Sequence, residues 1–173
     1  MDEVFDPGTH VELQGTTQCL DVFTDGSFDR TTGAGGWAFV VMQKGSLFHE
    51  EGGELLGHSN NSLELVAVAQ AVEWLQHSAP GAVSTVWTDS AYVIEGCCRW
   101  RAVWRNNGWK RMNPRPWTRR RTIPDAVIWK KIDGLLHRRP NVTMTLCKGH
   151  AGNSGNDKAD LLAKRWMSRS QQE

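Results

Sequence analysis

Four acidic side chains stand at places from which a folded chain could bring them together. Asp25 and Asp89 each end a short run of apolar and β-branched residues, which predicts two strands that finish in a carboxylate. Glu64 and Asp160 each fall near the start of a segment with helical spacing. Open α/β sheets place their ligands at the carboxyl ends of strands. Carboxylate oxygens are the ligands that Mg²⁺ prefers, so this set suits a site for divalent metal ions that assist a hydrolysis.

The segments that would position these carboxylates alternate between strand and helix patterns. Three predicted strands come first, over residues 19–28, 37–41 and 47–56, with glycine-containing turns between them. A helix, a strand at 83–89, further helices, a fifth strand at 141–147 and a last helix follow. Three consecutive antiparallel strands followed by helix–strand units predict an α/β fold, with a five-stranded mixed sheet and helices on both faces.

Particular residues are expected to begin or bend the helices. Asn61 or Ser62 is expected to cap the first helix, and Ser90 the second. We expect the second helix to bend at Gly96 and continue beyond it. Pro124 suits the start of the next helix, because its missing N–H would have no partner there anyway.

The length of 173 residues predicts a single domain with a substantial core. Residues 1–18 lack a clear period, so we expect a loosely ordered N-terminal extension, a domain over 19–169 and a tail at 170–173. No run is long enough to cross a bilayer, and the amino end lacks the plan of a signal peptide. The four cysteines fit neither a metal site nor an obvious disulfide framework. We therefore expect a cytoplasmic or nuclear protein that is not secreted, is not bound to a membrane and acts as a monomer.

The net charge of +1 conceals an uneven distribution. Residues 99–121 contain nine basic residues and no acid, which leaves 11 basic against 19 acidic residues elsewhere. A strongly basic element on an acidic body suggests a polyanion that one part holds and another part processes. Tryptophans interleave with these bases, which favours nucleic-acid binding over a plain solvated face.

Four short motifs occur in one order along the chain and together resemble one family. They are Thr-Asp-Gly-Ser at 24–27, Asn-Asn-x-x-Glu-Leu at 60–65, Thr-Asp-Ser-x-Tyr-Val at 88–93, and Lys-Gly-His-Ala-Gly at 148–152 with Ala-Asp at 159–160. Their order and spacing resemble those of type 1 ribonuclease H. The resemblance implies the ribonuclease H fold, with strands in the order 3-2-1-4-5. It also implies an endoribonuclease that cleaves the RNA strand of RNA–DNA hybrids.

The same resemblance implies a role for each acid. Asp25 would bridge two divalent metal ions, Glu64 and Asp89 would complete one metal site, and Asp160 would hold the other. Mg²⁺ is the implied ion, with Mn²⁺ as an alternative. His150 lies in a glycine-flanked loop, where an imidazole could shuttle protons or help the product to leave.

The family recognises the hybrid by its shape. The resemblance implies two groups of substrate-binding residues. Gly26, Ser27, Asn60 and Asn61 lie beside the acids, although the asparagines could instead cap the helix. Residues 99–121 resemble the basic protrusion of the family, and we call them the basic handle. Its predicted contacts are Trp100, Arg101, Trp104, Arg105, Trp109, Lys110, Arg119, Arg120 and Arg121. The tryptophans could instead form a small core of the handle.

The sequence also departs from the family pattern and leaves alternatives open. Ala91 stands where the family often has glutamine, and residues 30–32 differ from its usual turn rich in glycine and proline. A catalytically silent module that binds hybrids or double-stranded RNA is one alternative, and the ribonuclease H domain of a retroelement polyprotein is another. The wider superfamily of integrases, transposases and resolvases is a third. The intact acids argue against the first, and the motifs at 24–27 and 149–152 argue against the last.

Overall fold

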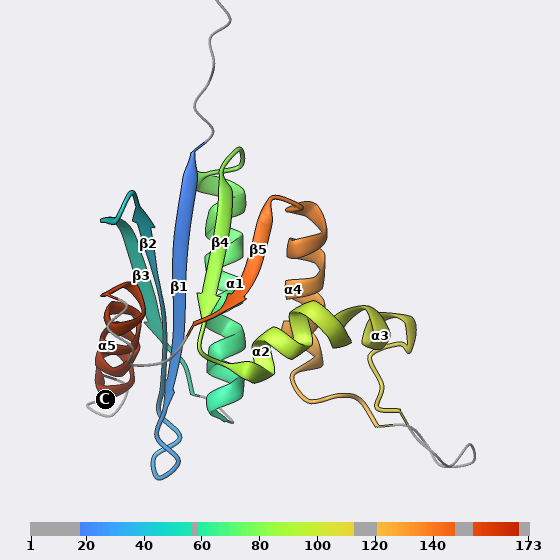
Figure 1. The fold of residues 1–173 in the computed structure, drawn as a ribbon. Helices are drawn as coiled ribbons and strands as arrows, with labels where there is room; N and C mark the ends of the chain where they lie inside the picture. Colours follow the sequence, from blue (N-terminus) through green and yellow to red (C-terminus); the bar gives the residue numbers. More distant parts are fainter. Residues whose placement is uncertain (1–17, 57–58, 113–120, 148–153, 170–173) are drawn as a thin grey trace, which may run out of the picture.

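Five strands form one mixed sheet in the computed structural model, which describes residues 18–56, 59–112, 121–147 and 154–169. The strand order is β3-β2-β1-β4-β5, as predicted (Figure 1). β1 pairs antiparallel with β2 and β2 with β3, whereas β1 with β4 and β4 with β5 are parallel. The strands are β1 (Cys19–Phe28), β2 (Gly35–Gln43), β3 (Ser46–Glu54), β4 (Val83–Thr88) and β5 (Val142–Leu146).

Helices cover both faces of the sheet, also as predicted. α1 (Asn60–Ser78) and α4 (Ala126–Arg138) lie on one face, and α5 (Ser154–Arg169) lies on the other (Figure 1). Three short helical segments follow β4 and project away from the sheet: α2 (Ala91–Glu95), the π-helical turn η1 (Gly96–Trp100) and α3 (Arg101–Asn106). Within the described ranges, no helix is long and apolar enough to cross a membrane.

The alternation of side chains along the strands creates two apolar layers. Val22 and Phe39 point toward α1 and join the main core. Their neighbours Phe23 and Val40 point to the opposite face, where they pack with Ala159 of α5. Because successive strand residues face opposite sides, one run of apolar residues supplies both layers.

α1 is held at its amino end by a residue that the sequence prediction did not select. Ser59, rather than Asn61 or Ser62, is the N-cap: its hydroxyl accepts a hydrogen bond from the backbone N–H of Ser62 at 3.2 Å. Ser59 has the extended backbone that a cap requires, whereas the two predicted residues already lie inside the helix. Ser90, by contrast, caps α2 as expected.

A buried arginine holds the carboxyl end of α1. The Arg139 guanidinium is buried and donates to the backbone carbonyls of Leu75, Ala79 and Ala82. Helix carbonyls at this end lack partners and carry partial negative charge, so a cation suits them. Arg139 thereby ties the end of α4 to the turn between α1 and β4.

α4 begins two residues after the predicted proline. Asp125 stands at the cap with a left-handed backbone (φ 53°), and the helix starts at Ala126. Pro124 therefore lies in the preceding turn, because the left-handed residue interrupts the helical path. The Asp125 carboxylate accepts a hydrogen bond from the Ser62 hydroxyl at 2.7 Å, which joins this turn to the start of α1.

Candidate active site

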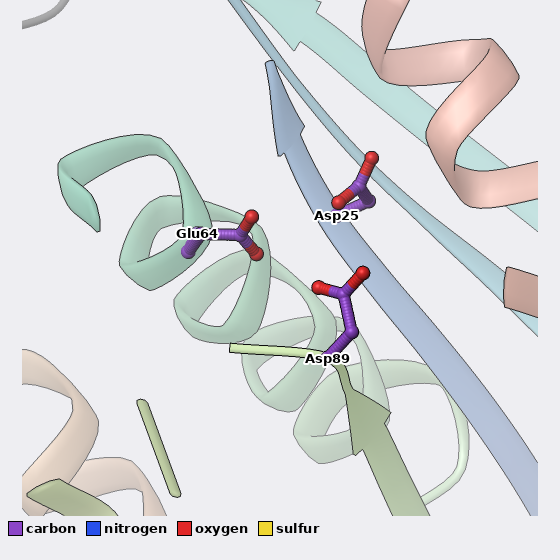
Figure 2. Close-up of side chains that lie close together, drawn as sticks. All are labelled: Asp25, Glu64 and Asp89. Carbon is purple, nitrogen blue, oxygen red and sulfur yellow. The ribbon is translucent and has the colours of Figure 1, made fainter. Parts of the chain in front are cut away.

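Three of the predicted acids converge at the centre of the sheet. Asp25 lies on β1, Glu64 in the first turns of α1, and Asp89 directly after β4 (Figure 2). One carboxylate oxygen from each lies within 4.8 Å of the others. Three separate segments thus deliver hard oxygen ligands to one point, which is the arrangement that the sequence motifs predicted.

Parallel pairing of β1 with β4 accounts for two of these positions. Phe23 pairs with Trp87, so Asp25 and Asp89 stand at the same level two residues further along the neighbouring strands. Gly26 then brings the third acid close. A Cβ atom at Gly26 would lie 2.5 Å from the backbone nitrogen of Glu64, so only glycine lets the first turns of α1 approach β1 this closely.

Burial and mutual repulsion make the cluster a poor place for unneutralised negative charge. Burial, with the charges of Asp89 and Asp160, raises the pKa of Asp25 from 3.8 to about 7. Burial, with the charges of Asp25 and Asp89, also raises the pKa of Glu64 well above its usual value. The ionisation of each of these carboxyls is therefore opposed by its neighbours, and a bound cation would relieve that repulsion.

The hydrogen-bond partners of Glu64 leave room for such a cation. Its Oε1 accepts a hydrogen bond from the Asn60 amide at 3.4 Å. Its Oε2 is buried and has no hydrogen-bond partner within the described part of the chain. A buried carboxylate oxygen without a partner is costly in the absence of a bound ion, so the donor set fits a divalent metal.

Asp160 lies on α5 at the side of this group. It contributes to the raised pKa of Asp25, which places it near that carboxylate. It also forms an ion pair with Lys164, one turn further along α5, at 2.8 Å. Asp160 is therefore positioned as a fourth acid whose charge is partly offset by its own helix.

The predicted substrate contacts beside the acids lie at the start of α1 and on β1. Asn60 and Asn61 are exposed, and neither caps the helix, since Ser59 does so. Gly26 is buried against α1, and the Ser27 hydroxyl donates to the sulfur of Met167 at 3.3 Å. The capping alternative for the two asparagines is thus removed, whereas their contact with substrate stays a prediction.

The tryptophans of the basic handle divide by burial. Trp104 packs on Trp129 of α4 with 5.1 Å between ring centroids, and Trp109 is also packed against the main core. Trp100 is 42% exposed and stacks on Trp104. Trp104 and Trp109 therefore join the handle to the body, and Trp100 is the handle tryptophan with an exposed ring among the residues that the structure describes.

The predicted basic contacts of the handle also divide. Arg101 and Arg105 both form ion pairs with Asp133 of α4, an acid that the sequence prediction did not connect with the handle. Lys110 and Arg121 are exposed, and the backbone of Lys110 bridges to that of Thr122. The predicted residues His150, Arg119 and Arg120 lie outside the described residues.

One further contact near the acids was missed. The Cys147 thiol, at the end of β5, donates to the buried Asn156 amide oxygen at 3.2 Å and joins the sheet to the first turn of α5. Burial raises the pKa of this thiol to about 11, so it stays protonated and able to donate. The sequence indicated only a last helix in this region, because a thiol partner cannot be recognised from spacing.

Comparison with known proteins places the whole described fold in one group. A family model described as RNase H matches residues 17–168. The ribonuclease H of Thermosynechococcus vestitus is 33% identical over 155 residues, covering 90% of this chain and 92% of that protein. The ribonuclease H of Paracidovorax citrulli is 37% identical over 145 residues, covering 83% and 91%.

Solved structures share the fold at lower sequence identity. A foamy viral protease-reverse transcriptase in complex with an RNA/DNA hybrid superposes with a TM-score of 0.76 at 19% identity, and the match covers 98% of this chain and 22% of the viral protein. LC9-RNase H1, a type 1 RNase H, superposes with a TM-score of 0.71 at 23% identity, covering 89% and 74%. These two likenesses concern the fold alone.

Proposed function

The chain belongs to the ribonuclease H family, whose members cleave the RNA strand of RNA–DNA hybrids. From that membership we propose which role each of its carboxylates has in the cleavage. The observation that carries the proposal is the convergence of Asp25, Glu64 and Asp89 from three separate segments. We assign Asp25 to both metal positions, Glu64 and Asp89 to one of them, and Asp160 to the other. Gly26 supports this set by letting α1 approach β1.

The metal requirement follows from the family and from the donor set. We propose Mg²⁺ as the working ion, with Mn²⁺ as an alternative, because every donor is a carboxylate oxygen. When bound, a pair of such ions supplies the charge that activates a water and stabilises the departing oxygen in this class of hydrolysis. The chain offers such ions the Glu64 oxygen that has no partner among the described residues, and their charge would relieve the repulsion that raises the pKa of Asp25.

The residues around the acids orient the strand to be cut. We propose that the backbone at Gly26 and Ser27 and the exposed amides of Asn60 and Asn61 contact the hybrid in its minor groove, where 2′-hydroxyls mark the RNA strand. Asn60 also donates to Glu64, so one amide would connect substrate position with the carboxylate cluster. We retain His150 as a proton carrier during product release.

The basic handle would hold the other strand away from the cleavage point. We propose that its exposed cations, among them Lys110 and Arg121, neutralise phosphates of the hybrid, and that Arg119 and Arg120 do the same. Trp100 of the same handle offers an exposed ring. These contacts would tighten binding without taking part in bond cleavage.

The setting in which the enzyme works is a separate proposal. We propose a catalytic domain over 19–169 that acts as a monomer, since one chain supplies all the clustered acids. Cys97, Cys98 and Cys147 form no disulfide, which supports work in the reducing cytoplasm or nucleus.

A single substitution tests the site. Asp89→Asn should abolish cleavage of a labelled RNA–DNA hybrid in Mg²⁺ and leave hybrid binding largely intact, because asparagine keeps the shape but loses the metal-binding charge. Asp21→Asn is the matched control, since an asparagine amide oxygen at that position can still accept the hydrogen bond that Trp87 donates at 2.9 Å. Activity of the Asp89 variant within about tenfold of the parent at saturating Mg²⁺ would overturn the assignment.

The parent protein provides the test of the activity itself. It should cut the RNA strand of the hybrid in Mg²⁺ and should not do so in chelator. Hybrid binding without cleavage would instead favour the silent binding module, and cutting of duplex DNA would revive the integrase alternative.

A further inference from the structure

One face of α4 carries two of the contacts that hold the basic handle to the body. Trp129 is fully buried there, and three segments meet it. The Tyr92 hydroxyl of α2 accepts a hydrogen bond from its indole at 3.1 Å, Gly96 of η1 lies against its ring, and Trp104 of α3 packs on it. Asp133 lies one turn further along the same helix, so the two side chains share a face.

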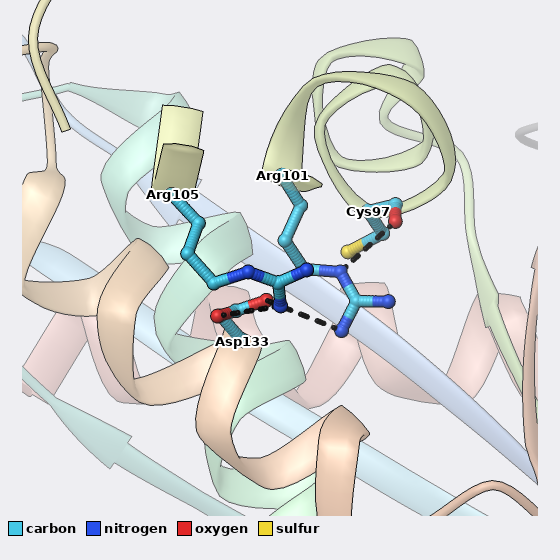
Figure 3. A network of polar contacts seen from close by, with 4 residues as sticks. All are labelled: Cys97, Arg101, Arg105 and Asp133. Atoms are coloured by element: carbon cyan, nitrogen blue, oxygen red, sulfur yellow. Dashed lines mark hydrogen bonds and ion pairs between the residues drawn. The ribbon is translucent and has the colours of Figure 1, made fainter. Parts of the chain in front are cut away.

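Asp133 is an acid buried as deeply as a core residue, with 7% of its surface exposed. Both of its oxygens accept from Arg105, at 3.0 and 3.2 Å, and Arg101 lies 3.6 Å from one of them (Figure 3). Arg101 is fixed in turn, because its Nε donates to the Cys97 carbonyl at 3.2 Å. One buried carboxylate thus organises two guanidinium groups of the handle.

The π-helical turn η1 places these arginines over α4. Besides Trp104, four residues that meet α4 are spaced by a step of four from Tyr92 to Gly96, a step of five to Arg101 and a step of four to Arg105. In a regular α-helix the middle step would bring Trp100 to this face instead. Gly96 permits the close approach, because a Cβ atom there would overlap the Trp129 ring.

The ion pairs divide the basic residues of the handle into paired and unpaired cations. Arg101 and Arg105 are engaged by Asp133, and Arg99 pairs with Glu95 on the handle's own helices. Lys110, Arg111 and Arg121, by contrast, are exposed and form no ion pair among the residues that the structure describes. Of the described basic residues of the handle, Arg101 and Arg105 therefore face α4, whereas these three are open to solvent.

We infer that Asp133 is a positioning residue, which fixes the direction of the handle so that the cations beyond Gly108, its outer cations, meet the hybrid. Arg101 and Arg105 then hold the handle to Asp133 rather than binding phosphate. The inference deepens the proposed function and rests on it. If both arginines turned away from α4 to bind phosphate, they would leave a buried carboxylate uncompensated, which is strongly unfavourable. Substrate affinity should therefore depend on Asp133 although it touches no substrate.

Asp133→Asn provides a test in which the two alternatives predict opposite changes in KM for the hybrid. If Asp133 positions the handle, its loss should raise KM for the hybrid about fivefold and leave kcat at the parental value, because handle contacts are equal in ground and transition states. If Asp133 merely restrains phosphate-binding arginines, its loss would free them and lower KM. A lowered or unchanged KM in a folded Asp133→Asn protein would overturn the inference.

Arg105→Gln keeps the test decisive even if the Asp133 variant does not fold, since the Arg105 side chain is about half exposed. It should also raise KM, but the slope of log KM against log salt should stay parental, because the bound handle makes the same phosphate contacts and only its placement costs more. A lost phosphate contact would instead flatten that slope by roughly 0.9. Such a flattening would overturn the inference.

Combinations and a measurement independent of cleavage complete the design. Asp133→Asn and Arg105→Gln should be non-additive, whereas Arg99→Gln, whose partner is Glu95, should add to Asp133→Asn. Hydrogen–deuterium exchange over residues 96–109 should increase in Asp133→Asn, and hybrid affinity in chelator should fall. If the parent protein failed to cleave the hybrid, only the proposed function would be overturned. If hydrogen–deuterium exchange and hybrid affinity were unchanged in Asp133→Asn, only this inference would be overturned.

Discussion

Asp25 and Asp133 are equally buried acids with opposite surroundings. Each exposes 7% of its surface. Asp25 faces other carboxylates, which together with burial raise its pKa to about 7, whereas Asp133 faces two guanidinium groups. Burial alone therefore does not distinguish a reactive carboxylate from a structural one. The sign of the neighbouring charges does: the first site needs a cation from outside, and the second already contains its cations.

The sharpest way to break this comparison is to remove charge from the first site. Glu64→Gln should reduce hybrid cleavage more than about a thousandfold, because the metal ligand is lost while the side-chain volume is kept. Glu73→Gln is the matched control on the same helix, where the acid only pairs with Lys131 at the surface. Comparable activities of the two variants in a fixed-time cleavage assay would mean that the cluster is not the active site.

The two acids should also affect stability with opposite signs when no metal is bound. Asp25→Asn should raise the free energy of unfolding in chelator at pH 8 by an amount on the order of a few kcal/mol. Asp133→Asn should lower it by about 2 kcal/mol, because two guanidinium groups lose their buried partner. Urea denaturation in chelator measures both, and equal signs would contradict the comparison.

The gain from Asp25→Asn should depend on pH. Because the pKa of Asp25 is raised, the folded state holds a proton that the unfolded state has released between about pH 4 and pH 7. The free energy of unfolding of the metal-free parent therefore falls as pH rises through this window. The advantage of the variant should be small at pH 4 and fully developed above pH 7, and a pH-independent advantage would show that repulsion among the acids is not its cause.

The handle tryptophans extend the comparison to apolar groups. Trp104→Ala should cost about 2 kcal/mol of stability, because this ring packs on Trp129. Trp100→Ala should cost less than about 1 kcal/mol, since its ring is more exposed, and should weaken hybrid binding instead. Thermal unfolding together with hybrid binding separates the two effects, and equal losses of stability would show that both rings belong to the core.

The smallest expected effect concerns the outer cations of the handle. Replacing Arg119, Arg120 and Arg121 together by alanine should raise KM several-fold, flatten its salt dependence by roughly two to three units and spare kcat. Lys130→Ala, an exposed cation on α4 outside the handle, is the control. A parental KM and salt slope in the triple variant would show that this run is only a solvated surface.

The sequence was sufficient to predict the strand order and the meeting of Asp25, Glu64 and Asp89. Each acid belongs to a short motif, and the element beside it follows from local patterns, so the family resemblance could join them. The prediction also singled out Gly96, which is where the π-helical turn begins.

Contacts between distant segments could not be predicted in the same way. The absence of acids from 99–121 suggested unpaired bases, but Asp133 lies 28 residues from Arg105 and reaches it only through the fold. The role of Arg139 at the end of α1 was also missed, because Arg139 donates to backbone carbonyls about 60 positions earlier in the sequence. The Ser59 cap was missed because several adjacent residues have side chains that suit a cap. Only the backbone conformation, which is extended at Ser59, decides which of them is the N-cap.

The five-residue step between Gly96 and Arg101 has a consequence for chain length. A π-helical turn contains one residue more than an α-helical turn, and the helices on either side keep their faces. A chain that lost one residue here, such as the exposed Cys98, should therefore form a continuous α-helix that still presents Trp104 to α4. A deletion within α3 would instead rotate the residues beyond it by about 100°. This turn is thus the point at which the handle tolerates a change of length without losing its attachment.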